Sequence, residues 1–326
     1  MSPELTCWSI TEGFAGMENQ CVGLSEALGL TCELKRVQRP LTPTCLLPPR
    51  FWPNPLSTIS VGPRETWPDV VISSGRGSVA AALAIRRANS PRTFNIHIQS
   101  PYVHPSSFDI VVIPQHDNLR GSNVLVTKTA LHRVTETRLI EAAEKFAGRL
   151  SHLPRPLIAV LVGGSNKTQE CSSRVIGRLS ELLLSAARQC GGSLAVTTSR
   201  RTGSENEEAL REHLQAVPLF FWNGMDENPY FGLLALADAI VVTSDSVSMV
   251  SEACATGKPV HVFSLGQAHK KLHKFHRALL DAGLTRPFDG RLEQWSYDPP
   301  RETQKVAEIV RERIMRSRGA WATSSR

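Results

Sequence analysis

The sequence predicts an α/β protein with two Rossmann-like, doubly wound domains that face each other across a cleft. Short apolar runs alternate with helical patterns along the chain, which is typical of parallel sheets covered by helices. The chain has 326 residues, and this length favours two domains of ~150 residues each. We therefore expect one sheet in each half of the chain.

The composition is that of a soluble globular protein, with 41% hydrophobic and 21% charged residues. No run reaches the ~20 apolar residues of a membrane-spanning helix, and the N-terminus lacks the features of a signal peptide. We therefore expect a cytoplasmic protein. The seven cysteines are scattered and include no Cys-x-x-Cys pair, which argues against a disulfide framework and a zinc site.

The net charge of +7 indicates an anionic partner, such as acidic lipid headgroups or a phosphorylated small molecule. The alternative is a mildly basic, arginine-rich protein without a specific anionic partner. Because the sequence has neither a zinc-finger pattern nor an RNA-binding aromatic signature, we do not expect it to bind nucleic acid.

The first half, residues 1–150, forms the predicted N-terminal, acceptor-side domain. Its segment 40–68 is rich in proline and tryptophan and cannot be a regular helix. We interpret this segment as a long structured loop on the acceptor side or facing a membrane. The expected strands of this domain are Thr6–Ile10, Asp69–Ser73, Thr93–Ile98, Asp109–Ile113 and Asn123–Thr127.

The second half, residues 157–300, forms the predicted donor domain, after a proline-containing linker around residues 148–157. Residues 301–326 form a C-terminal helix and tail, because apolar residues recur there at helical spacing. We expect this helix to pack on the body of the protein. The expected strands of the donor domain are Leu157–Val162, Leu194–Thr198, Val217–Trp222, Ala239–Thr243 and Pro259–Phe263.

A glycine turn follows the first strand of the second half, in the sequence "VLVGGSNK" (160–167). Gly163 and Gly164 would let the backbone approach a ligand closely, and free N–H groups at the next helix start favour phosphate oxygens. The spacing is not that of a P-loop. The alternative interpretation is an ordinary tight turn between strand and helix.

Two adjacent arginines, Arg200 and Arg201, follow Ser199 at the end of the next strand, in "TTSRRTG". Ligands of open α/β sheets bind outside the carboxyl ends of the strands, and arginines there suit a pyrophosphate. A solvated surface pair is the alternative.

A third strand end carries the sequence "VTSDSVSMVSEACATGKPV" (242–260), which is rich in hydroxyl groups. Ser244, Asp245 and Ser246 are candidates to cap the following helix, whose inward stripe would contain Val250. Glu252 would point away from that stripe, where its carboxylate could accept hydrogen bonds from two vicinal ribose hydroxyls. The alternative is a solvated helix residue.

Two further patterns suggest cofactor sites, which we reject. "ISSGRGSVAAAL" (72–83) contains Gly-x-Gly-x-x-Ala, but no acidic residue lies between Val70 and Phe108, where a nicotinamide dinucleotide site needs one. His269, His273 and His276 share a helical face, but three metal ligands rarely converge from one helix and no nearby acid completes the set. We interpret the first pattern as a ligand-facing turn and the second as a basic face that meets phosphates. We expect no metal.

The glycine turn, the Ser-Arg-Arg strand end and the hydroxyl-rich helix resemble the donor half of GT-B glycosyltransferases, especially the peptidoglycan N-acetylglucosaminyltransferase family. More specifically, the chain resembles the Elm-type mitochondrial fission family between about residues 13 and 263. The motifs that carry this resemblance are "GFAGMENQCVGLSEALGL", "PQHDNLRGSNVLVTKTALHRVT", "TTSRRTG", "NPYFGLLALAD" and "TSDSVSMVSEA". The bacterial members of this family are regarded as glycosyltransferases, so the resemblance implies a GT-B-like fold.

The resemblance also implies a donor site in the second half. Small hydroxyl residues would leave room for the nucleotide while offering donors and acceptors at a helix N-terminus. The implied residues are Gly163, Gly164 and Ser165 facing the diphosphate, Ser199 and Arg200 beside it, Thr243, Ser244 and Ser246 lining the same crevice, and Glu252 on the ribose hydroxyls.

The general base is less well defined, because the glycine loop of the peptidoglycan enzymes ends in a histidine and the corresponding loop here (11–20) has none. The base must therefore come from Glu12, Glu18, His116 or Asp117.

The implied activity is metal-independent transfer of a sugar from a nucleoside diphosphate donor to a glycan, lipid or cell-envelope acceptor. Analogy predicts inversion at the anomeric carbon. The nucleotide sugar is then a substrate, no cofactor is expected, and a lipid acceptor implies peripheral contact with the inner membrane surface. Two alternatives are a sugar-nucleotide epimerase of the same fold and a non-enzymatic membrane-fission adaptor, since plant members of the family are linked to organelle division.

Overall fold

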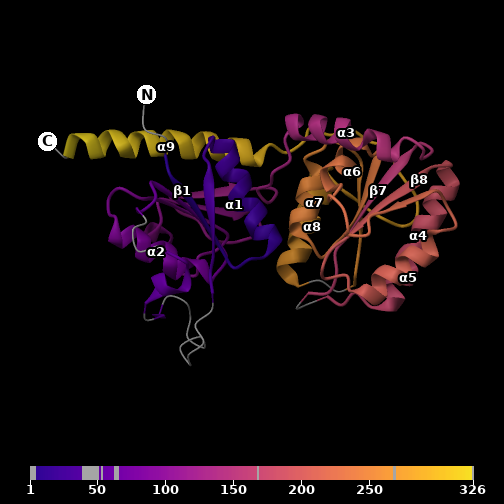
Figure 1. Cartoon of the computed structure of the whole chain (residues 1–326), viewed down its shortest axis with the longest axis horizontal. Coiled ribbons are helices and arrows are strands. Elements are labelled where there is room, and N and C mark those ends of the chain that lie inside the picture. The colour runs from indigo at the N-terminus through magenta and orange to yellow at the C-terminus, as the bar shows by residue number, and fades with distance from the viewer. Residues whose placement is uncertain are drawn as a thin grey trace. The chain divides into compact units, whose positions relative to one another are not determined.

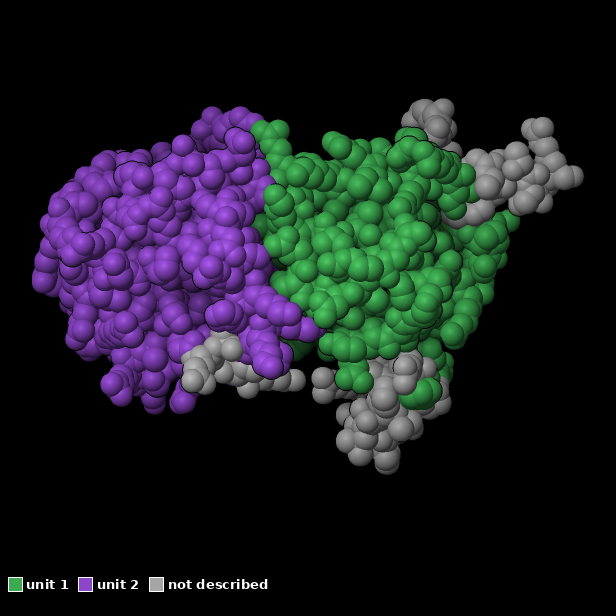
Figure 2. Space-filling view, turned by 180° about the vertical axis from the view of Figure 1, so that it is seen from behind, with its two compact units in different colours: residues 1–133, 301–326 green, residues 134–300 purple. Residues whose placement is uncertain are grey.

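The protein forms two compact units, residues 1–133 with 301–326 and residues 134–300 (Figure 2). The computed structural model describes residues 5–38, 51–52, 54–61, 66–166, 169–266 and 269–324. Residues 40–50, 53 and 62–65 of the predicted loop at 40–68, and Lys167 of the glycine turn, therefore lie outside the described residues. Each unit contains a six-stranded sheet whose neighbouring strands all run parallel. The predicted pair of doubly wound parallel sheets is confirmed.

The sheet of the first unit has the strand order β2-β1-β3-β4-β5-β6. Five of its strands overlap the apolar runs in the sequence. The four central ones are buried on both faces and therefore contain few polar residues, whereas β6 is a partly exposed edge strand. The sixth, β2, was not predicted, since its sequence "CELKR" is polar and it lies at the sheet edge. The strands are β1 Cys7–Thr11, β2 Cys32–Arg36, β3 Val70–Ser74, β4 Phe94–Ile98, β5 Ile110–Pro114 and β6 Val124–Thr127.

Helices cover both faces of this first sheet (Figure 1). The helix α1 (Ala15–Leu28) and the C-terminal helix α9 (Glu302–Ser324) pack on each other and on one face. Val306, Val310 and Ile314 of α9 belong to the core of that face, so the C-terminal helix packs as its apolar spacing predicts. The helix α2 (Ser78–Ala88) covers the other face, and the short helices η3 (Pro55–Thr58) and η4 (Pro105–Ser107) contact it.

The sheet of the second unit has the strand order β12-β11-β10-β7-β8-β9. The helices α4 and α5 pack on one face, and α3, α6, α7 and α8 pack on the other (Figure 1). The strands are β7 Leu157–Val162, β8 Ser193–Thr198, β9 Leu219–Phe221, β10 Ala239–Thr243, β11 Val260–Phe263 and β12 Arg286–Pro287. The helices are α3 Glu136–Leu150, α4 Ser173–Cys190, α5 Ser204–Leu214, α6 Tyr230–Leu236, α7 Val247–Cys254 and α8 Lys270–Asp281.

The division between the units differs from the sequence-based boundary at residue 150. Helix α3 belongs to the second unit, where it packs along α6. The contact is close: a Cβ on Gly232 would lie 2.7 Å from a ring carbon of Phe146. The prolines at 154 and 156 therefore join two elements of one unit. No helix among the described residues is long and apolar enough to cross a membrane.

Candidate functional site

The carboxyl edge of the second sheet brings together the three polar strand ends singled out in the sequence. Strands β10, β7 and β8 are adjacent and parallel, so their following turns meet at the same edge. Ser244, Gly163 and Ser199 are the first residues after these strands. Adjacent strands lie only ~4.8 Å apart, and the three turns therefore form one continuous surface.

The glycine turn is packed tightly against its own chain. The N–H of Gly163 donates to Thr243 Oγ1 at 2.8 Å, and the N–H of Gly164 donates to Asp245 Oδ2 at 3.1 Å. A Cβ on Gly163 would lie 2.2 Å from an Asp245 oxygen, and one on Gly164 would lie 2.0 Å from the carbonyl oxygen of Arg201. The two glycines are thus required by contacts within the protein.

Asp245 is the anion at the centre of this crevice. Its side chain is 0% exposed and accepts hydrogen bonds from Thr243 Oγ1 at 2.6 Å, Gly164 N and Arg201 Nη2 at 2.6 Å. The Asp245 carboxylate therefore already accepts a hydrogen bond from one backbone N–H, that of Gly164, in the predicted phosphate-binding turn. The sequence suggested only a helix-capping role for Asp245. Its position between two serines at a strand end was the available signal.

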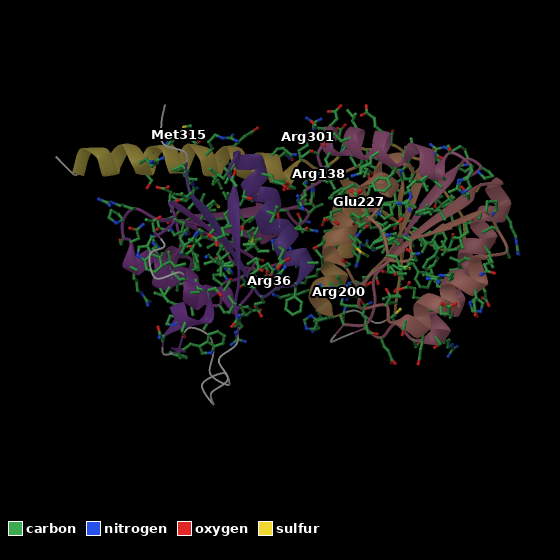
Figure 3. The ribbon with its side chains drawn as sticks, in the orientation of Figure 1. Arg36, Arg138, Arg200, Glu227, Arg301 and Met315 are labelled. Carbon is green, nitrogen blue, oxygen red and sulfur yellow. The ribbon has the colours of Figure 1, made fainter. Side chains whose placement is uncertain are left out.

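The two arginines of the Ser-Arg-Arg motif differ in their contacts. Arg201 donates to the carbonyl oxygen of Gly164 at 3.2 Å as well as to Asp245, and its side chain is 43% exposed. Arg200 is exposed and has no ion-pair partner in the described part of the chain (Figure 3). Arg201 is therefore built into the glycine turn, whereas Arg200 faces solvent.

The hydroxyl groups of the site already have hydrogen-bond partners within the protein. Ser165 Oγ accepts from the N–H of Cys171 at 3.0 Å, and Ser199 Oγ lies 3.4 Å from Thr202 Oγ1. Ser246 caps α7 by accepting from the N–H of Met249 at 3.3 Å. Thr243 and Ser244 are buried, whereas Ser165 is exposed and Ser199 and Ser246 are partly exposed. A ligand could reach only the last three hydroxyls.

Glu252 does not point outward, and this prediction is wrong. The residue is 2% exposed, and Tyr230 Oη donates to its Oε2 at 2.5 Å. Burial, and then the neighbouring carboxylate, raise the pKa of the Tyr230 hydroxyl well above its usual value, so this group stays protonated and donates. Every residue from Val250 to Cys254 is buried, because α7 is covered on more than the single face that a helical stripe implies.

Glu12 and Glu18, two of the four candidate bases, contact other residues of the first unit. Glu12 Oε1 accepts from the N–H of Gly77 at 2.7 Å, and a Cβ on Gly75 would lie 2.7 Å from the same oxygen. Glu12 thus fills the Gly-x-Gly turn that resembles a dinucleotide site. Glu18 makes a two-point contact with Arg36, at 2.7 and 3.2 Å.

The other two candidates, His116 and Asp117, follow β5. The backbone carbonyl of Asp117 accepts from Arg120 at 2.6 Å. Strands β3 and β4 separate the end of β5 from Glu12 at the end of β1, a distance of ~14 Å at ~4.8 Å per strand. The four candidates therefore do not form one cluster, and the choice of general base stays open.

A pocket of about 480 Å³ lies farther along the carboxyl edge of the second sheet, beside Ser244 and between α8 and strands β11 and β12. His273 and His276 line it, whereas His269 caps the start of α8. His276 Nε2 lies 2.7 Å from the carbonyl oxygen of Ser244, and burial lowers the pKa of His276. The three histidines thus have different surroundings, and no group of metal-ligating side chains is assembled within the described ranges.

Comparisons with known proteins agree on family and fold. The model of the family "Mitochondrial fission ELM1" matches residues 15–314. The chain is 31% identical to mitochondrial fission protein ELM1 of Arabidopsis thaliana, over 97% of this chain and 92% of that protein. It is 25% identical to an uncharacterized protein of Rickettsia prowazekii (strain Madrid E), over 75% of this chain and 79% of that protein.

Three solved structures share the architecture. The UDP-GlcNAc 2-epimerase of Methanocaldococcus jannaschii matches with a TM-score of 0.57 and 12% identity, over 94% of this chain and 99% of that one. The Neisseria meningitidis UDP-GlcNAc 2-epimerase, bound to UDP-GlcNAc, matches with a TM-score of 0.52 and 13% identity, over 95% of this chain and 94% of that one. The glycosyltransferase SnogD of Streptomyces nogalater matches with a TM-score of 0.51 and 14% identity, over 99% of both chains. At these identities the likeness concerns the fold alone. The chain thus has a GT-B-like fold and belongs to the mitochondrial fission ELM1 family.

Proposed function

We propose that the second unit binds a nucleoside diphosphate sugar at the carboxyl edge of its sheet, and that the protein transfers the sugar to a glycan, lipid or cell-envelope acceptor. The observation that carries this proposal is the position of Arg201. Asp245 holds its guanidinium group at the glycine turn at 2.6 Å, yet the side chain is 43% exposed. A fixed, half-exposed guanidinium group at a strand end suits a diphosphate.

The surroundings of Arg201 fit the same ligand. Arg200 supplies a second positive charge without a competing ion pair in the described residues. The N-terminus of α7, capped by Ser246, adds a partial positive charge at the same edge. Ser165 and Ser199 offer accessible hydroxyls. The epimerase of Neisseria meningitidis, which shares the fold, binds UDP-GlcNAc.

Metal-independent transfer follows if these groups offset the charge that develops on the leaving diphosphate. Preorganised donors in a crevice can stabilise such a charge in the way a bound cation does. Asp245 would act as a positioning residue: it orients Arg201, and its own negative charge keeps a phosphate on the solvent side of the guanidinium group. Glu252 is 2% exposed and accepts from the Tyr230 hydroxyl, so in this structure it supports α7 instead of a ribose.

Calorimetry with UDP, GDP and CMP, with EDTA present, tests the binding site. Arg201→Ala removes charge-assisted hydrogen bonds of ~1.5–3 kcal/mol each, so affinity for the preferred nucleotide should fall tenfold or more. Because this variant leaves Asp245 buried without its cationic partner, its melting temperature is measured as well, and Arg201→Lys should recover part of the affinity. Arg200→Ala should weaken binding without lowering stability.

The matched control is Arg188→Ala. Arg188 is exposed in the last turn of α4, and α4 leads back to the opposite edge of the sheet. Equal losses of affinity in Arg188→Ala and Arg201→Ala would mean that only overall charge matters, and the crevice would not be the site.

Product analysis separates the three classes of function. A glycosyltransferase releases the nucleoside diphosphate only when an acceptor or water takes the sugar, whereas an epimerase converts the nucleotide sugar without an acceptor. A non-enzymatic adaptor would bind none of the three nucleotides. Strict dependence of turnover on added Mg²⁺ or Mn²⁺ would contradict the metal-independent mechanism.

A further inference from the structure

The pocket beside α8, here called the α8 pocket, has the size of a small-molecule site. Its volume is about 480 Å³, within the range of ~300–1,000 Å³ that is usual for ligand pockets. It lies entirely within the second unit, between α8 and strands β11 and β12. An inorganic phosphate is far too small to fill this volume, so a matching ligand has an organic part.

The hollow arises from the way α8 is attached to the sheet. Phe275 and Leu279 anchor the helix in the core, while its side with His273, Arg277 and Leu280 lines the pocket. The strand β12 below is only two residues long. Both of its residues, Arg286 and Pro287, line the pocket as well.

The inner surface of the α8 pocket combines apolar and cationic groups. Val262, Leu280 and Pro287 supply apolar walls, which favour an apolar part of a ligand over ordered water. Two arginines, Arg277 and Arg286, also line the pocket, and none of its described lining residues is acidic.

The ion pairs of both arginines are exposed. Arg277 pairs with Asp281 and Arg286 with Glu293, and neither acid lines the pocket. Arg286 also lies over the ring of Trp295 at 4.6 Å, a contact that uses the face of the guanidinium group and leaves its N–H edge for an anion. Both acids have side chains that are 56% exposed. Such exposed ion pairs contribute little to stability, so an anionic ligand can compete for the guanidinium groups at small cost.

We propose that the α8 pocket binds an organic anion whose apolar body contacts Val262, Leu280 and Pro287 and whose phosphate or carboxylate group meets Arg277 and Arg286. This site is distinct from the crevice proposed for the nucleotide. That crevice lies at the ends of β7, β8 and β10, and of its residues only Ser244 lines the pocket. Ser244 is committed internally, since its Oγ accepts from the N–H of Leu265 at 3.1 Å and its carbonyl oxygen contacts His276.

A fluorescence titration of the full chain with 8-anilinonaphthalene-1-sulfonate, an aromatic anion, tests the proposal. The probe is then displaced with octyl phosphate, octanoate, octanol or inorganic phosphate. The first two should compete with micromolar to millimolar constants, and the last two should fail at the same concentrations. The stronger of the two competitors identifies the anionic group that the pocket prefers.

Three variants locate the binding. Arg277→Ala combined with Arg286→Gln should weaken octyl phosphate at least tenfold, and Leu280→Trp should abolish probe binding by filling the pocket. Lys274→Ala is the matched control, because Lys274 is an exposed cation on α8 outside the lining, and its affinity should stay within twofold of the wild type. Melting temperatures verify that each variant is folded.

Several outcomes would overturn the proposal. They are unchanged affinity in the pocket variants, an equal loss in Lys274→Ala, or displacement by octanol as effective as that by octyl phosphate. Loss of probe binding in Arg201→Ala would show that the probe occupies the nucleotide crevice instead. Because the assay needs no nucleotide, its result is independent of the glycosyltransferase proposal.

Discussion

Replacing Glu252 separates a structural role from a ribose-binding role. Glu252→Ala removes the acceptor of the buried 2.5 Å hydrogen bond from Tyr230. The loss of a hydrogen bond to a charged group costs ~1.5–3 kcal/mol, and truncation of a buried side chain adds to it. We expect the free energy of unfolding to fall by about 3 kcal/mol, which corresponds to about 6–12 °C in melting temperature for a domain of this size.

The pair can be measured directly with a double-mutant cycle. Tyr230→Phe, Glu252→Gln and the double variant are unfolded in urea, and we expect a coupling energy of about 1–3 kcal/mol between the two positions. Glu252→Gln should be milder than Glu252→Ala because its amide oxygen still accepts a hydrogen bond. Glu181→Ala, at an exposed position on α4, serves as the control and should change stability by no more than about 0.5 kcal/mol.

Nucleotide affinity is measured on the same variants below their melting temperatures. If Glu252 supports α7, folded Glu252→Ala binds nucleotide with an affinity close to that of the wild type. A variant with unchanged melting temperature and a tenfold loss of nucleotide affinity would refute the structural interpretation, and it would restore the ribose-binding role implied by the sequence resemblance.

Three further changes have expected outcomes. Gly164→Ala places a Cβ 2.0 Å from the carbonyl oxygen of Arg201 and should lower the free energy of unfolding by about 2 kcal/mol or more. Gly177→Ala, with open space around its Cβ, should raise the free energy of unfolding by about 0.5–1 kcal/mol. Both variants are unfolded in urea, and equal changes in stability would contradict the argument. Burial lowers the pKa of Lys258 in the folded protein to about 8, whereas an unfolded lysine has a pKa of about 10.4. Between these pKa values the unfolded state binds more protons than the folded state, so the free energy of unfolding should rise from pH 8 to about pH 10 in the wild type but not in Lys258→Met. Parallel profiles of unfolding free energy against pH for the two proteins would contradict this prediction. Deletion of residues 301–326 removes Val306 and other core residues from the first unit and should abolish its cooperative unfolding while the second unit still melts cooperatively; two intact transitions in calorimetry would be the contrary result.

The strands were predictable wherever burial on both faces made them apolar. Strand β7, Leu157–Val162, coincides with its predicted range. Strand β2 escaped prediction because a polar edge strand lacks that pattern, and β12 was missed because two residues are too few to show any periodicity.

The site was predictable in its location but not in its contacts. Glycines and hydroxyls at strand ends indicated the correct edge of the sheet, since topology alone brings those ends together. The partners of Asp245 and Glu252 lie far away in the sequence: Gly164 is 81 residues from Asp245, and Tyr230 is 22 residues from Glu252. No local pattern reveals such pairs, and a helical stripe cannot show that α7 is covered on several sides.

The return of α9 to the first unit has a consequence for the order in which the protein folds. Residues 134–300 interrupt the first unit in the sequence, and Val306, Val310 and Ile314 of α9 complete its core. During synthesis the ribosome therefore releases the whole second unit before the helix that the first unit needs. Domains fold as units while the chain grows, so the second unit can mature while the first 133 residues still expose the apolar surface of α1. A segment that is synthesised after the second unit thus completes the first unit.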